Sequence, residues 1–184
     1  MTTTATFLDH PRDIYSRGNS EALRNLIQSV FVTECLVPSK SIWMISAWIS
    51  DIDILDNRSG QFSGVAPDWA HSRVRLSSVL ATLLQSGCAI TVITNTSEHN
   101  KPFRRAMEQI NRGNRYKFRY EEVEGEHEKG IVTDKCLIDG SMNFTYNGIF
   151  INKEHVIYRT RVEDIALRRV TLAGQWGAPH AVQG

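Results

Sequence analysis

The sequence predicts an α/β protein with a largely parallel central sheet flanked by helices. Helical and extended stretches alternate along the chain as far as Tyr120. Two of the extended stretches, 41–50 and 88–95, are apolar on both parities, as expected for strands covered on both faces of a sheet. The intervening stretches carry apolar residues at spacings of three and four, which is typical of helices that bury one face.

The first half of the chain contains the best-defined elements. A helix is expected to begin after Asn19 or Ser20, either of which can cap it, and to end before Pro38. The strand over 41–50 follows as a central strand. A polar segment without periodicity over 51–69 is then expected to form a long loop beyond the C-terminal end of that strand.

The second half continues the alternation and then becomes rich in strands. Ser72 is expected to cap a second helix that Gly87 closes. The later elements predicted are a strand over 88–95, a helix over 99–112, strands over 116–120, 127–134, 135–141 and 155–159, and a terminal helix over 162–172. No internal repeat is visible. We therefore expect one domain over 1–184, with a polar lead over 1–18 and a flexible tail over 174–184.

The composition restricts the class of protein. Hydrophobic residues make up 41% and charged residues 22%, which are ordinary values for a globular protein. The formal net charge is +1, so a polyanion would have to bind to local basic patches. Three widely spaced cysteines favour reduced thiols and a cytoplasmic location. No apolar run reaches the roughly 20 residues of a membrane-spanning helix, and the N-terminus does not resemble a signal peptide, so we expect no stable membrane insertion.

The polar residues of greatest interest lie in one predicted hairpin. The period of two along its first strand places His127 and Lys129 on one face and Asp134 on the other. Ser141 and Asn143 share a parity at the end of the second strand. The hairpin can therefore present an imidazole, an ammonium and two neutral donors to one ligand, and a phosphate suits this set best. Asp134 is expected to bond to backbone or loop groups instead.

The pattern His-x-Lys-x4-Asp, followed by Gly-Ser-x-Asn, resembles the signature of the phospholipase D superfamily. In this chain its residues are His127, Lys129, Asp134, Gly140, Ser141 and Asn143. The similarity continues through Phe144, Thr145, Gly148, Asn152 and Glu154. The five-residue gap before Gly140 is one residue shorter than the commoner family spacing. The chain carries one copy of the motif, like the small bacterial members that resemble nucleases.

The resemblance implies an α/β/α sandwich with the phospholipase D-like fold and phosphodiester chemistry that needs neither metal nor cofactor. His127 would be the nucleophile that forms a phosphohistidine, and it must be neutral to attack phosphorus. Lys129 and Asn143, with Ser141 in support, would bind the non-bridging oxygens and stabilise the developing charge. Glu154 would orient the imidazole and determine its tautomer.

The mechanism that the resemblance implies also needs a second histidine to protonate the leaving oxygen. Because the motif occurs once, the second imidazole would be His127 of another copy of the chain. We therefore expect a homodimer with one active site shared across a twofold interface. The two imidazoles would titrate as a coupled pair and produce a bell-shaped pH profile.

Three functions remain open on the sequence alone. The favoured one is a nuclease that cleaves DNA or RNA, with a possible place in DNA restriction or phage defence. One alternative is a phospholipid phosphodiesterase, for which the loop over 51–69 is the only candidate acyl groove. The other alternative is a catalytically silent nucleic-acid-binding scaffold or a subunit of a larger defence complex.

Other residues are weaker candidates for contacts with nucleic acid. The basic residues that could bind a phosphate backbone, or form an ordinary solvated face, are Arg112, Arg115, Lys117 and Arg119. Trp69 in the long loop is a candidate for stacking on a base, whereas Trp43 and Trp48 are expected to pack in the core. The remaining histidines lack metal-ligand spacing, so we expect no metal site.

Overall fold

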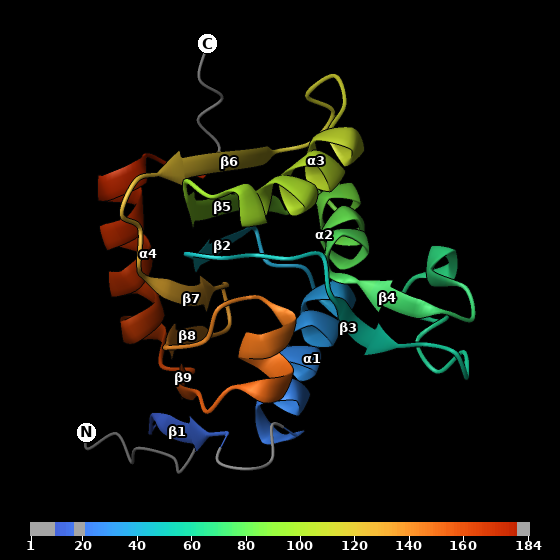
Figure 1. Cartoon of the computed structure of the whole chain (residues 1–184), viewed down its shortest axis with the longest axis horizontal. Helices are drawn as coiled ribbons and strands as arrows, with labels where there is room; N and C mark the ends of the chain where they lie inside the picture. Colours follow the sequence, from blue (N-terminus) through green and yellow to red (C-terminus); the bar gives the residue numbers. More distant parts are fainter. Residues whose placement is uncertain (1–9, 17–20, 180–184) are drawn as a thin grey trace, which may run out of the picture.

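A seven-stranded sheet forms the middle layer of the computed structural model, which describes residues 10–16 and 21–179 (Figure 1). In spatial order its strands are β1 (Arg12–Tyr15), β9 (His155–Arg159), β8 (Leu137–Gly140), β7 (Lys129–Val132), β2 (Ser41–Ser46), β5 (Ala89–Asn95) and β6 (Phe118–Val123). The β2–β5 and β5–β6 pairs are parallel, and the other pairs in this sheet are antiparallel. The sheet is mixed, and only β2, β5 and β6 run parallel to one another, whereas the sequence predicted a largely parallel sheet.

Helices cover both faces of the sheet. Those on one face are α1 (Glu21–Leu36), α2 (Leu76–Gln85) and α3 (Lys101–Ile110), and α4 (Val162–Trp176) covers the other. Met44 and Ile131 belong to the apolar cluster under α1, α2 and α3. Their neighbours Ile45 and Val132 pack with Leu172 of α4. Alternate residues thus enter opposite layers, which explains why β2 is apolar on both parities. The predicted α/β/α sandwich is confirmed.

The segment predicted as a long loop over 51–69 contains β3 (Asp53–Asp56) and η2 (Pro67–Trp69). β3 pairs antiparallel with β4 (Arg73–Arg75), which follows this segment, and the two form a second, two-stranded sheet. Because β4 lies between Ser72 and α2, Ser72 does not cap that helix, and its hydroxyl donates to the Trp69 carbonyl. The Asp51 carboxylate caps α2 instead, accepting from both the backbone nitrogen and the hydroxyl of Ser77 at 2.9 Å.

Several element boundaries also differ from the prediction. β2 ends at Ser46 rather than at residue 50, and α4 continues to Trp176 into the segment predicted as a tail. The polar lead contains β1, an edge strand whose short polar sequence carries no clear period. Residues 1–9, 17–18 and 180–184 of the predicted lead and tail lie outside the described residues. None of the described helices is long and apolar enough to cross a membrane.

The three cysteines are free thiols whose reactivity burial should suppress. Burial raises the pKa of Cys35 and of Cys88 to about 12, and that of Cys136 to about 11. Because the thiolate is the reactive form, labelling by a thiol reagent at pH 8 should be slow in the folded protein and complete in denaturant. Rapid labelling of all three thiols in the folded protein would contradict this expectation.

The same shifts predict how stability depends on pH. An unfolded cysteine ionises near pH 8.5, whereas the folded thiols stay neutral to higher pH. Their contribution to the free energy of unfolding is therefore complete below about pH 8.5 and is lost as the pH rises toward 11. Urea unfolding at pH 7.5 and pH 10 measures the decline, which should be smaller in Cys88→Ala than in the parent protein.

Candidate active site

The predicted catalytic residues gather at one edge of the sheet. The C-terminal ends of the parallel strands β2, β5 and β6 meet at this edge. Because β7 runs antiparallel to β2, its first residue, Lys129, lies at the same edge, beside the end of β8 and the start of β9. His127, Ser141 and Glu154 lie directly outside these strand ends. Three adjacent strands thus bring the motif residues to one place.

His127 and Lys129 occupy the connection from β6 into β7. The side chain of His127 is exposed, and its imidazole makes no hydrogen bond to any described residue. The Lys129 ammonium is half-buried and donates to the carbonyl oxygen of His127 at 2.5 Å. Lys129 shares its parity with Ile131 and therefore points to the α1 side of the sheet. This arrangement leaves the imidazole accessible to a ligand and holds the Lys129 ammonium at the backbone of the same residue.

Asn143 is held by the segment that follows β2. Its Oδ1 accepts hydrogen bonds from the Ser46 hydroxyl at 3.3 Å and from the backbone nitrogen of Trp48 at 3.2 Å. Ser46 is fully buried, and its hydroxyl also lies 2.7 Å from the Trp48 carbonyl and accepts from the Phe144 nitrogen at 3.1 Å. With its oxygen engaged, the amide presents its NH₂ group, which can donate to an anionic oxygen.

Replacing Ser46 should loosen this support. Ser46→Ala leaves buried partners without their hydrogen bonds, and the free energy of unfolding should fall by about 1–3 kcal/mol. Ser41→Ala is the matched control, because Ser41 is equally buried at the other end of β2, where its hydroxyl accepts from Arg169. Urea unfolding measures both losses. The side-chain amide resonances of Asn143 should shift in Ser46→Ala only, and unchanged resonances would contradict the supporting role.

Ser141 and Glu154 hydrogen-bond to each other at the start of β9. The Ser141 hydroxyl donates to Glu154 Oε2, and Asn152 Nδ2 donates to Glu154 Oε1 at 3.2 Å. The Glu154 carboxylate makes no hydrogen bond to His127 within the described residues. In this arrangement the carboxylate positions the Ser141 hydroxyl, and the role of Glu154 in orienting the imidazole stays a prediction.

The edge strand β1 anchors this part of the site. The Glu154 backbone nitrogen donates to the Ser16 hydroxyl at 2.6 Å, and the Ser16 nitrogen donates to the Glu154 carbonyl at 2.9 Å. His155 Nε2 lies 2.7 Å from Asp13 Oδ1, and its ring stacks on Tyr15 with centroids 4.3 Å apart. His155, the second histidine of the motif region, is therefore in contact with two side chains of β1.

Asp134 lies at the opposite end of β7. Its carboxylate accepts from the Lys40 nitrogen at 2.6 Å and from the guanidinium of Arg169, which belongs to α4. These bonds tie the β7–β8 turn to the start of β2, away from His127. Gly140 is at the site edge, where a Cβ would collide with the His155 carbonyl, so the close approach of β8 and β9 requires glycine there.

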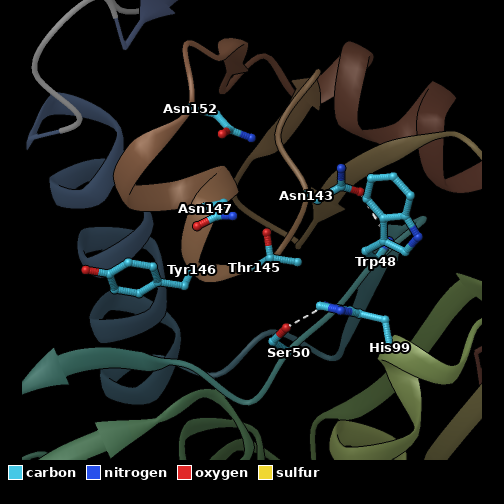
Figure 2. A pocket seen from close by; sticks show the side chains of 8 residues that line it. All are labelled: Trp48, Ser50, His99, Asn143, Thr145, Tyr146, Asn147 and Asn152. Carbon is cyan, nitrogen blue, oxygen red and sulfur yellow. Dashed lines mark hydrogen bonds between the residues drawn. The ribbon is translucent and has the colours of Figure 1, made fainter.

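A pocket of about 470 Å³ opens beside Asn143 (Figure 2). Its lining residues are Trp48, Ser50, His99, Asn143, Thr145, Tyr146, Asn147 and Asn152. They come from the segment after β2, from η3 (Glu98–Asn100), and from the segment after β8 that includes η4 (Asn147–Ile151). His99 Nε2 lies 2.8 Å from the Ser50 hydroxyl. Neither His127 nor Lys129 lines this pocket, so it adjoins the motif residues through Asn143.

Sequence reasoning missed this pocket because it misplaced the tryptophans. Trp48 was predicted to lie in the core, but β2 ends before it and its side chain is 50% exposed. Trp69 was predicted to be accessible to a base, but it is 5% exposed and its indole nitrogen donates to Thr82 at 3.1 Å. The prediction that Trp69 stacks on nucleic acid is therefore wrong. One feature of the sequence does indicate the pocket, namely the serine and asparagine residues that follow the buried strands.

The basic residues predicted to contact nucleic acid do not lie in this site. Arg119 is wrong as a candidate, because its side chain is 13% exposed, packs over the Trp43 ring at 5.5 Å and lies 3.6 Å from Glu121. Arg112, Arg115 and Lys117 are exposed before the start of β6, at the sheet edge opposite to His127. Within the described residues, no group of three or more histidine, cysteine or acidic side chains could hold a metal ion.

Comparison with known families assigns the fold. A sequence model described as cardiolipin synthase, PLD-like domain, matches residues 40–168, which is more than half of the chain. The chain belongs to the phospholipase D-like family. The match spans every motif residue from His127 to Glu154. No curated protein sequence matches the chain.

Solved structures agree with the family at the level of the fold. NucT from Helicobacter pylori has a TM-score of 0.59 and 13% identity, with 90% of this chain and 94% of that chain covered. Nuc, a phospholipase D family member from Salmonella typhimurium, has a TM-score of 0.59 and 14% identity, with 91% and 93% covered. TrmBL2, an archaeal chromatin protein described with a novel mode of DNA binding, has a TM-score of 0.52 and 11% identity, with 94% and 54% covered.

Proposed function

We propose that the protein is a phosphodiesterase that cleaves nucleic acid through His127 and uses neither metal nor cofactor. The observation that carries this proposal is the set of groups at one sheet edge. The exposed His127 imidazole makes no hydrogen bond to a described residue, and the Lys129 ammonium donates to the backbone carbonyl of the same residue. The Asn143 amide, with its oxygen bonded to Ser46 and Trp48, can donate to a phosphate oxygen. Membership in the phospholipase D-like family supports phosphodiester chemistry for this set.

In the proposed reaction, neutral His127 attacks phosphorus and displaces one ester oxygen, which takes a proton from a second imidazole. A phosphohistidine forms as the P–O bond breaks. Water then attacks phosphorus and gives up a proton to the second imidazole, and the P–N bond breaks to release the phosphate monoester and His127. Lys129 and Asn143 bind the non-bridging oxygens, on which negative charge grows in both steps. Ser141, positioned by Glu154, supports these contacts.

A second copy of the chain is proposed to supply the second imidazole. The motif occurs once in the sequence, and His155, the histidine next to Glu154, is engaged by Asp13 and Tyr15. An isologous homodimer that brings the two His127 side chains to one shared site completes the pair. The protein would then need two chains for each active site. A role in DNA restriction or phage defence and a cytoplasmic location stay predictions from the sequence.

The test is hydrolysis in the presence of excess EDTA. Purified protein is incubated with single-stranded DNA, double-stranded DNA, RNA and phospholipid vesicles at equal phosphodiester concentration, with His127→Ala purified in parallel as the control for contaminating nucleases. We expect hydrolysis of at least one nucleic acid by the parent protein only. Cleavage of the phospholipid alone would favour the lipid phosphodiesterase. Tight DNA binding without cleavage of any substrate would favour a silent scaffold.

A further inference from the structure

The polar pocket beside Asn143 has the size and position of a second recognition site. Its volume of about 470 Å³ lies within the range of small-molecule sites in proteins. Asn143 belongs both to this pocket and to the group that we propose binds the scissile phosphate. We infer that the pocket binds the nucleobase of the nucleotide next to that phosphate, with the Trp48 indole as the stacking surface. This inference rests on the proposed function for its placement beside the phosphate.

The charge of the lining selects the class of ligand. None of the residues that line the pocket carries a carboxylate, an ammonium or a guanidinium group. A second phosphate would call for cations, a cationic lipid headgroup for carboxylates or an aromatic cage, and an acyl chain for an apolar lining. The lining here combines aromatic rings with side-chain amides and hydroxyls. A neutral planar ring with hydrogen-bonding edges, which is what a nucleobase is, suits this combination best.

Trp48 has the properties of a stacking platform. Its side chain is 50% exposed, and the Trp48 contacts that support Asn143 and Ser46 use its backbone nitrogen and carbonyl. The indole makes no hydrogen bond to any residue that the structure describes. In Figure 2, Trp48 and His99 lie on one side of the pocket and Asn147 and Asn152 on the other. Stacking on an aromatic side chain tolerates any base, because every base has a flat π face. The opposite side of the pocket can then read the edge of the base.

The amides on that side keep hydrogen-bonding capacity for a ligand. Asn152 Nδ2 donates to Glu154, which leaves Asn152 Oδ1 to accept. The side-chain amide of Asn147, which lines the pocket, makes no hydrogen bond within the described residues, so both its donor and its acceptor are available. The pair of a donor and an acceptor on one amide matches the paired groups on the edges of bases. Asn147 is thus a candidate for base preference and Trp48 for base affinity.

Binding, measured without turnover, tests this inference. In a His127→Ala background, fluorescence anisotropy gives the dissociation constants of labelled oligothymidylate and of an abasic oligomer with the same number of phosphates. We expect the base-bearing oligomer to bind more tightly, by roughly 5- to 150-fold. The added change Trp48→Ala should remove most of this preference, and the matched change Trp48→Phe should retain most of it. Circular dichroism checks that each variant is folded.

Three results would overturn the base site. The first is equal binding of the two oligomers, and the second is a preference that persists in Trp48→Ala. The third is dissociation of the dimer by Trp48→Ala in sedimentation, which would make the exposed indole part of an interface. Hydrolysis is measured separately with His127 intact. Base preference without hydrolysis would contradict the proposed phosphodiesterase chemistry but support the base site. Hydrolysis without base preference would support the chemistry but contradict the base site.

Discussion

His127→Ala is expected to abolish phosphodiester hydrolysis, with a fall in kcat of at least about 10⁴-fold, because it removes the nucleophile. The fold should survive the change. The His127 side chain is exposed and its imidazole makes no hydrogen bond to a described residue, so the free energy of unfolding should change by less than about 0.5 kcal/mol. Initial rates in EDTA and urea unfolding measure the two quantities on the same preparations.

The matched control is His71→Ala. His71 is also exposed, but it lies in the segment before β4, where its ring faces the Arg58 carbonyl at 3.3 Å. The His71→Ala protein should lose little of the hydrolytic activity. A His127→Ala protein that turns over at the parental rate would rule out the phosphohistidine, and equal losses in both variants would point to a general effect on the protein.

Asn143→Asp is expected to lower kcat by about 10²- to 10³-fold or more without unfolding the protein. A carboxylate is close in shape to the amide and can still accept from the Ser46 hydroxyl and the Trp48 nitrogen. The change therefore keeps the local structure but replaces the NH₂ donor with a negatively charged oxygen that repels phosphate. Steady-state kinetics should place the loss in kcat, because the donor acts on charge that grows in the transition state.

Asn111→Asp is the control for this substitution. Asn111 also uses its Oδ1 to accept from a backbone nitrogen, that of Tyr116 at 2.8 Å, and it lies at the end of α3 near the opposite sheet edge. The kcat of the Asn111→Asp protein should stay close to that of the parent protein. If Asn143→Asp retained full kcat, Asn143 would have only a structural role in joining β8 to β2.

Much of the fold could be predicted because burial leaves a local record in the sequence. β2 and β5 are covered on both faces, so both parities are apolar, and the helices show the spacing of one buried face. The motif likewise predicted which polar residues reach the site edge, because strand ends in a hairpin have a defined order. What local pattern predicts poorly is where a strand stops.

The end of β2 illustrates this limit. Residues beyond Ser46 remain apolar enough to continue the strand, but the Ser46 hydroxyl bonds to the Trp48 carbonyl and to Asn143, which is 97 residues away in sequence. That long-range contact turns the chain and exposes Trp48. Trp69 is buried against α2, where its indole nitrogen donates to Thr82, 13 residues away in sequence. The exchange of roles between the two tryptophans, and with it the pocket, depends on contacts that no local periodicity encodes.

The capping of α2 by Asp51 and the support of Glu154 by Ser16 have the same origin. Each joins groups far apart in sequence, through side chains that look like ordinary polar loop residues. The contact of Glu154 with Ser141 could not be derived from the strand pattern either, because it depends on the conformation of the segment between β8 and β9. Nearby residues of that segment, Ser141 and Asn152, hold the carboxylate.

Subunit mixing tests the central claim, that two chains build one active site, most directly. Parent protein and His127→Ala protein are combined in equal amounts, and exchange is verified by co-purification of differently tagged chains. If each site needs both His127 side chains, activity should fall to about a quarter of that of the same total amount of parent protein, because only parent–parent dimers are complete. Activity of about one half, proportional to the parental chains, would contradict the shared site.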